Sequence, residues 1–114
     1  GKVEVRSVRC LPRINSFTFE FEANFCAPSS VRYSLSGEDK VLTDTSATNG
    51  VDKGLGYCAF VHNIIDLQPG VYEVSIISPQ GSVLADPKTK KPWMCRALTS
   101  DEYQGSTPEA EVSK

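Results

Sequence analysis

The sequence lacks a long apolar run and lacks a dominant charge. No stretch of about 18 apolar residues is present, so no membrane-spanning helix is predicted. The 14 acidic and 12 basic side chains nearly cancel, which disfavours nucleic acid or an anionic membrane as the partner of the whole surface. We therefore expect no nucleic acid and no membrane span, and any basic partner site must be local.

The chain is also poor in groups for catalysis and metal binding. Histidine occurs once, as His62, and no serine or cysteine lies beside it in the sequence. Carboxylates are scattered, and Glu20 and Glu22 alternate along one segment as on a solvated strand face. The cysteines form no Cys-x-x-Cys pair, the spacing that zinc sites normally use. We expect no enzyme activity, no metal and no cofactor.

What the chain does contain is an even set of widely spaced cysteines, at Cys10, Cys26, Cys58 and Cys95. Such a set in a small domain indicates two disulfides. A reducing cytosol would keep these thiols free, so the sequence predicts a secreted or extracellular protein. Four cysteines allow three pairings.

Short strand-like segments fill most of the chain. The clearest begins where Phe17, Phe19 and Phe21 alternate with polar residues, a period typical of a strand with one buried and one wet face. Seven such segments separated by turn residues predict one all-β domain over residues 1–99.

Two stretches have little to bury. Residues 44–56 consist largely of Thr, Ser, Asn, Asp and Gly, which predicts a flexible loop. Residues 100–114 carry few apolar groups and several carboxylates, which predicts a flexible acidic tail.

A proline-glycine turn delivers a tyrosine to the head of an alternating segment, through Leu67, Pro69, Gly70 and Tyr72. Such a tyrosine can bury its ring while its hydroxyl bonds to the backbone of the preceding corner. These residues resemble the corner before strand F of immunoglobulin-like and fibronectin type III-like domains. The resemblance implies a seven-stranded antiparallel immunoglobulin-like sandwich with two disulfides, and it implies no particular function.

The resemblance also implies a disulfide pairing. With strands that alternate in direction, Cys26 ends strand B at the pole where strand E begins with Cys58. Cys10 then ends strand A near the pole where strand G ends with Cys95. The favoured pairs are Cys26 with Cys58 and Cys10 with Cys95.

One basic cluster stands out, formed by Lys88, Lys90, Lys91, Trp93 and Arg96. One interpretation is a solvated loop whose lysines discourage pairing with another sheet edge. The other is a binding surface for an acidic partner, with an exposed tryptophan as anchor and the cations for steering.

These observations favour a non-catalytic recognition module, secreted or at the cell surface, that binds another extracellular protein. Adhesion domains, immune ligands and secreted effectors are of this kind. One alternative is a secreted inhibitor that presents residues 44–56 or 86–92 to a hydrolase. Another is a sandwich that binds a small molecule or glycan.

Overall fold

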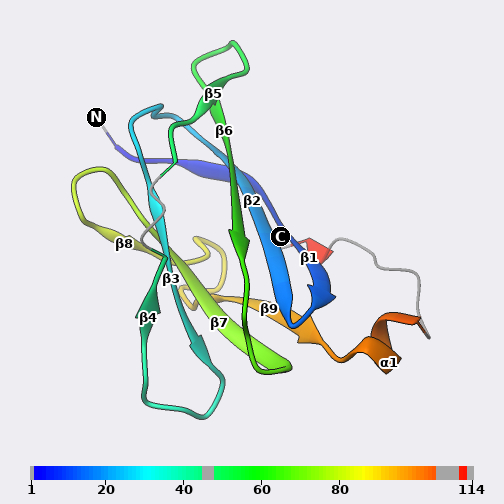
Figure 1. Ribbon diagram of the computed structural model, residues 1–114. Helices are drawn as coiled ribbons and strands as arrows, with labels where there is room; N and C mark the ends of the chain where they lie inside the picture. Colours follow the sequence, from blue (N-terminus) through cyan, green and yellow to red (C-terminus); the bar gives the residue numbers. More distant parts are fainter. Residues whose placement is uncertain (1, 45–47, 105–110, 113–114) are drawn as a thin grey trace.

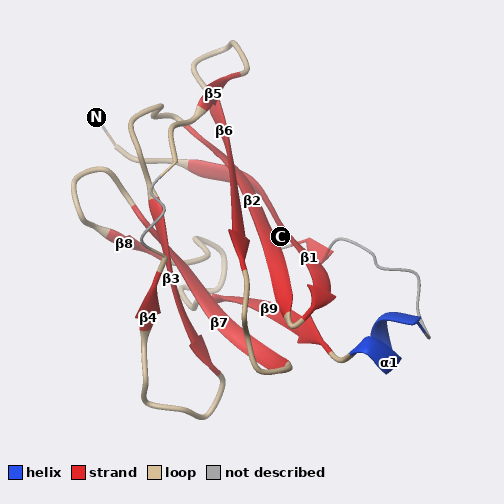
Figure 2. Ribbon diagram, in the orientation of Figure 1, coloured by secondary structure: helices blue, strands red, loops and turns tan. Residues whose placement is uncertain are grey.

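The computed structural model describes residues 2–44, 48–104 and 111–112, and nearly all of them lie in strands and connecting loops (Figure 1; Figure 2 shows the strands in red). Ten strands and one helix occur in this range: β1 (Val5–Ile14), β2 (Ser16–Ala23), β3 (Ser30–Leu35), β4 (Leu42–Thr43), β5 (Val51–Asp52), β6 (Cys58–Ile64), β7 (Gly70–Ile77), β8 (Val83–Leu84), β9 (Trp93–Leu98), α1 (Ser100–Gln104) and β10 (Glu111–Val112).

The strands form one curled sheet, a half-barrel, in the order β4-β3-β7-β9-β1-β2-β6-β5. We call β5-β6-β2-β1 the first arm and β9-β7-β3-β4 the second arm. Neighbours within each arm are antiparallel, whereas β1 and β9 run parallel where the arms join. The two short strands β8 and β10 attach to β7 and β1.

The expected mostly-β fold with two disulfides is confirmed, but the predicted seven-stranded sandwich needs correction. The described residues contain ten strands in one curled sheet. Three of the additional elements, β5, β8 and β10, are two residues long, too short to leave an alternating pattern in the sequence. The β1–β9 contact, which spans only two residue pairs, makes the two arms one continuous sheet.

The core lies between the arms and is built mainly on β2. Phe17, Phe19 and Phe21 are buried on its inner face. Phe19 packs against Trp93 of the second arm at 5.8 Å between ring centroids, and Phe21 stacks on Phe60 at 4.9 Å. Each buried aromatic side chain contributes about 2–3 kcal/mol, so this alternation is the main reason why the segment folds inward.

Tyr72 forms the predicted corner. Its side chain is buried, and its hydroxyl donates to the Gln68 carbonyl oxygen at 2.6 Å. The ring packs against Phe17 at 5.9 Å between centroids. The corner therefore fixes the start of β7 against β2.

The two disulfides join the pairs favoured by the sequence. Cys10–Cys95 links β1 to β9 across the junction of the arms, and Cys26–Cys58 links the end of β2 to the start of β6. Each closes a long loop and contributes about 3–5 kcal/mol by restricting the unfolded chain. The parallel β1–β9 contact is thus covalently reinforced.

The predicted loop and tail both contain regular structure. Residues 44–56 include β5, and Thr48 forms a β-bridge with Ser29. The tail includes α1 and β10, which pairs with β1. Helix α1 starts with a capping box, in which Glu102 accepts from the Thr99 amide and the Thr99 hydroxyl accepts from the Glu102 amide. The rest of these two predictions, residues 45–47, 105–110 and 113–114, lies outside the described residues.

Candidate functional site

The structure divides the predicted basic cluster. Trp93 is 2% exposed and belongs to the core, so it cannot act as the exposed anchor that the sequence analysis placed there. The reason is strand register: Trp93 lies opposite Val74, whose side chain is also buried. Arg96 is exposed on the other face of β9 and forms an ion pair with Glu102 at 3.4 Å.

Lys88, Lys90 and Lys91 remain exposed, in the loop between β8 and β9. This lysine loop, residues 86–91, is ordered by Asp86, whose side chain accepts from the Lys88 amide at 3.0 Å. The Asp86 backbone exchanges hydrogen bonds with Lys90 and Lys91. The loop therefore presents three cationic side chains on an ordered turn, and the buried Trp93 side chain does not contribute to that surface.

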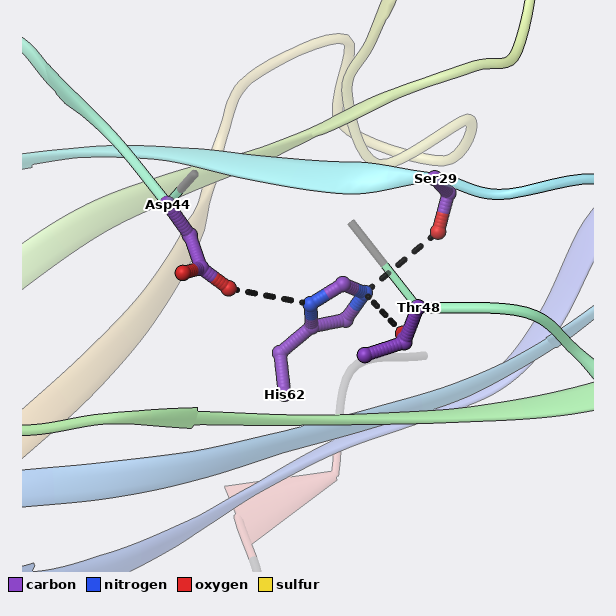
Figure 3. Close-up of polar contacts among 4 residues, drawn as sticks. All are labelled: Ser29, Asp44, Thr48 and His62. Carbon is purple, nitrogen blue, oxygen red and sulfur yellow. Dashed lines mark hydrogen bonds and ion pairs between the residues drawn. The ribbon is translucent and has the colours of Figure 1, made fainter. Parts of the chain in front are cut away.

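A second group of polar residues, which we call the His62 cluster, consists of Ser29, Asp44, Thr48 and His62 (Figure 3). The His62 Nδ1 lies 3.2 Å from the Asp44 Oδ2. Its Nε2 lies 3.3 Å from the Ser29 Oγ and 3.5 Å from the Thr48 Oγ1. His62 belongs to β6 in the first arm, whereas the other three residues flank β3 and β4 of the second.

The order carboxylate, imidazole and hydroxyl is that of a hydrolase triad, but the surroundings are those of a core. Ser29 is 2% exposed and His62 is 1% exposed, so a substrate carbonyl has no access to the serine oxygen. The imidazole ring also stacks on Phe21, with 6.0 Å between centroids and 9° between planes. Burial lowers the pKa of His62, and the hydrogen bond and charge of Asp44 only partly oppose this.

A neutral imidazole with its proton on Nδ1 suits this site. Its Nδ1 donates to Asp44, and the single lone pair on Nε2 accepts from the Ser29 hydroxyl at 3.3 Å, with the Thr48 hydroxyl farther away at 3.5 Å. Among the described residues, no buried side-chain nitrogen or oxygen lacks a hydrogen-bond partner. The cluster therefore joins the free edges of the two arms by hydrogen bonds, opposite the junction that Cys10–Cys95 reinforces.

The third region is the turn between β5 and β6, which projects beyond the rest of the sheet at the top of Figure 1. We call Lys53, Gly54, Leu55, Gly56 and Tyr57 the hairpin tip. Gly54, Leu55 and Gly56 have φ values of +81°, +56° and +82°. Leucine rarely adopts such a φ, which costs an L-residue about 1–2 kcal/mol. Leu55 is also 95% exposed, so burial of its side chain among the described residues does little to offset that cost.

The hairpin tip is held in place despite its exposure. The Lys53 amide donates to the Tyr57 carbonyl at 2.9 Å, and the Tyr57 amide donates to the Gly54 carbonyl at 3.2 Å. At its base, the Tyr57 hydroxyl donates to Glu4 at 3.0 Å, and the Arg6 guanidinium lies 3.6 Å above the ring centroid. The hydrogen bond to Glu4 is the main reason why the pKa of Tyr57 is raised.

The outer face next to this hairpin is arranged in rows. Arg6 and Arg9 of β1 pair with Glu22 and Glu20 of β2, so the charges on these two strands neutralise each other. The row on β5 and β6 is apolar, and it consists of the exposed Val51 and Val61 with the partly buried Ala59 between them. The most exposed apolar side chains of this arm thus follow the hairpin from the sheet to its tip.

Sequence reasoning missed the His62 cluster because its members come from three separate segments of the chain. It named residues 44–56 as a candidate inserted loop but did not single out Leu55. The signal available was Gly-Leu-Gly, because two glycines around a leucine favour a left-handed turn.

Comparison with known proteins does not assign a family or a function to the chain. No family model matches the chain, and no curated protein or solved structure is significantly similar to it. Within the described ranges, no helix is long and apolar enough to cross a membrane. Over the same ranges, no group of three or more His, Cys, Asp or Glu side chains is placed to hold a metal ion.

Proposed function

We propose that this chain is a secreted or cell-surface recognition module that binds another extracellular protein through its hairpin tip. The observation that carries this proposal is Leu55, a nearly fully exposed leucine in a strained and ordered backbone conformation. Strain of this kind is retained where it serves a site. An exposed apolar side chain on a rigid support is suited to fill a pocket of a partner.

An immunoglobulin-like fold is part of the proposal. The first arm has the strand order of an A-B-E-D sheet, and the second has that of a C′-C-F-G sheet. The hydroxyl bond of Tyr72 to Gln68 at the corner before β7 adds support. Domains of this architecture commonly bind through end loops carried on a rigid sandwich.

The extracellular location rests on the cysteines. Both disulfides pair residues distant in the sequence, and the chain has no free cysteine. Such bridges persist in oxidising compartments. A non-catalytic role is supported by the burial of His62 and Ser29 in the His62 cluster, the place in the described chain where an imidazole meets a hydroxyl and a carboxylate.

The lysine loop has a secondary role in this proposal. Of the predicted partner site, Lys88, Lys90, Lys91 and Arg96 are exposed, and Arg96 pairs with Glu102. The three lysines would steer an acidic partner during approach. Reversing Lys90 and Lys91 to glutamate is then expected to slow association, while dissociation is governed by the hairpin tip.

The test is affinity capture from extracellular material with four immobilised proteins: wild type, Leu55→Ala, Val83→Ala and Lys90→Glu/Lys91→Glu. Val83 is the matched control, because it is an exposed valine on a different hairpin. A partner that wild type and Val83→Ala retain and Leu55→Ala loses supports the proposal. A hydrolase as that partner would identify the inhibitor alternative. Equal retention by wild type and Leu55→Ala would contradict the role of the tip.

A further inference from the structure

One long strand of the sheet has an edge that the described chain covers only at its start. Strand β6 pairs along its full length with β2, from Cys58 to Ile64. On its other side, β5 pairs only with Cys58 and Ala59. Between residues 60 and 64, no strand of the described ranges lies on that side.

Gly50 explains why the chain leaves this edge. Its amide donates to the Cys26 carbonyl at 3.0 Å. A Cβ at this position would lie 2.6 Å from the Cys58 Cβ and 2.7 Å from the Phe60 Cζ. The backbone therefore crosses the inner face of β6 and continues to Thr48, which pairs with Ser29 beside the second arm.

Among the residues that the structure describes, no backbone partner lies opposite this open edge. The Lys53 amide donates to the Tyr57 carbonyl, so residue 57 directs its backbone groups away from β2. Because this direction alternates along an antiparallel strand, Val61 and Asn63 also direct their N–H and C=O groups outward. Their side chains lie on the exposed outer face, where Val61 is 49% exposed.

The composition of this edge favours pairing. Residues 60–65 read Phe-Val-His-Asn-Ile-Ile, with no charge and no proline, and Ile65 is exposed. Natural edges are usually protected by charged residues, prolines or bulges. None of these occurs between residues 60 and 65 on the exposed face, whereas Asp39 and Lys40 precede β4 at the opposite edge.

We propose that the β6 edge, residues 60–64, pairs antiparallel with the same edge of a second copy of this chain. Around a two-fold axis at His62, Val61 of each copy exchanges both backbone hydrogen bonds with Asn63 of the other. The edge is self-complementary because pairing places no like charges opposite one another, and the net charge of the whole chain is only -2. Pairing lies beyond β5, so it leaves the hairpin tip free.

Sedimentation velocity from micromolar to near-millimolar concentration tests this with wild type, Val61→Lys and Val83→Lys. Glu20 of β2 lies opposite Val61, so a lysine there has an acidic neighbour within its own chain. We expect a concentration-dependent dimer for wild type and Val83→Lys. Val61→Lys should raise the dissociation constant about tenfold or more while retaining wild-type thermal unfolding.

Amide hydrogen exchange supplies the second readout. The Val61 and Asn63 amides should exchange slowly at high concentration and rapidly at low concentration, with Val61→Lys rapid at both. A monomer throughout, equal weakening by Val83→Lys, or assemblies that grow beyond two copies would overturn the proposal. Protection of these amides by a different protein, in a chain that remains monomeric, would assign the edge to a foreign strand instead.

Discussion

The His62 cluster and the hairpin tip both differ in burial from what their residue types would suggest. The cluster contains the groups used for acid-base chemistry, yet its histidine and serine are buried and bond to other parts of the fold. The tip contains a leucine, a residue of the core, yet that leucine is almost fully exposed. Residue type alone thus suggests catalysis for the His62 cluster and a core position for the hairpin tip. The burial of His62 and the exposure of Leu55 argue against these two interpretations.

This difference in burial indicates that the His62 cluster contributes to stability and the hairpin tip to recognition. A buried polar group must be paired, and each of its bonds costs free energy when broken. An exposed apolar group on a strained turn contributes little to folding and is available to a partner. We therefore expect changes in the His62 cluster to affect stability and changes in the hairpin tip to affect binding.

The largest expected effect is that of His62→Ala. The substitution leaves a cavity beside Phe21 and removes one hydrogen-bond partner each from Asp44, Ser29 and Thr48. We expect the free energy of unfolding to fall by about 3–5 kcal/mol, measured by denaturant unfolding. Asn63→Ala, on the exposed face of the same strand, should change it by no more than about 1 kcal/mol. Equal effects of the two would show that the cluster does not join the arms.

Tyr72→Phe is expected to have a smaller effect. It keeps the buried ring and deletes the hydroxyl that donates to the Gln68 carbonyl, so unfolding should cost about 1–3 kcal/mol less. Tyr57→Phe deletes a hydroxyl that bonds to Glu4 at the surface, and its effect should stay within about 0.5 kcal/mol. The role of the Tyr72 hydroxyl at the corner would be contradicted if the denaturant midpoint of Tyr72→Phe were as close to wild type as that of Tyr57→Phe.

Acid should weaken the fold through His62. Burial lowers its pKa in the folded protein, whereas in the unfolded chain the pKa is about 6.5. Below that pH the unfolded state binds a proton that the folded state does not, so stability falls as pH falls, by up to about 1.4 kcal/mol per pH unit. Above it this contribution is fully present and constant. Denaturant unfolding between pH 8 and 5 measures the slope, and the portion due to His62 should be absent in His62→Ala. An identical slope in that variant would assign the effect to other groups.

Much of the fold could be predicted from sequence, because local patterns carry it. The phenylalanine alternation predicted β2, and the Pro69-Gly70 turn predicted the Tyr72 corner. The strands β5 and β10 could not be predicted, because two residues hold no period. Val83 and Leu84 read as the start of a hairpin arm, and they form the separate short strand β8. Helix α1 had a readable signal, the Thr99–Glu102 capping box, that the acidic composition of the tail obscured.

The candidate site was less predictable, because it depends on tertiary contacts. Trp93 reads as a neighbour of the lysines along the chain, but strand register turns it toward Phe19. Ser29 and His62 are 33 residues apart, and only the curling of the sheet brings them together. Leu55 is conspicuous only once its exposure and φ are known.

The smallest expected effect on stability is that of Leu55→Gly. Glycine adopts a positive φ without strain, but it also gains freedom in the unfolded chain. These contributions oppose one another, so the free energy of unfolding should remain within about 0.5 kcal/mol of wild type. Denaturant unfolding checks this, and a larger loss would mean that the leucine side chain packs within the fold.

The most direct test of the account compares partner binding by wild type and Leu55→Gly at equal stability. With the partner identified by affinity capture, titration calorimetry should give a dissociation constant at least about tenfold higher for Leu55→Gly. The account predicts this loss of affinity together with an unchanged unfolding midpoint. A wild-type dissociation constant for Leu55→Gly would contradict recognition through the hairpin tip.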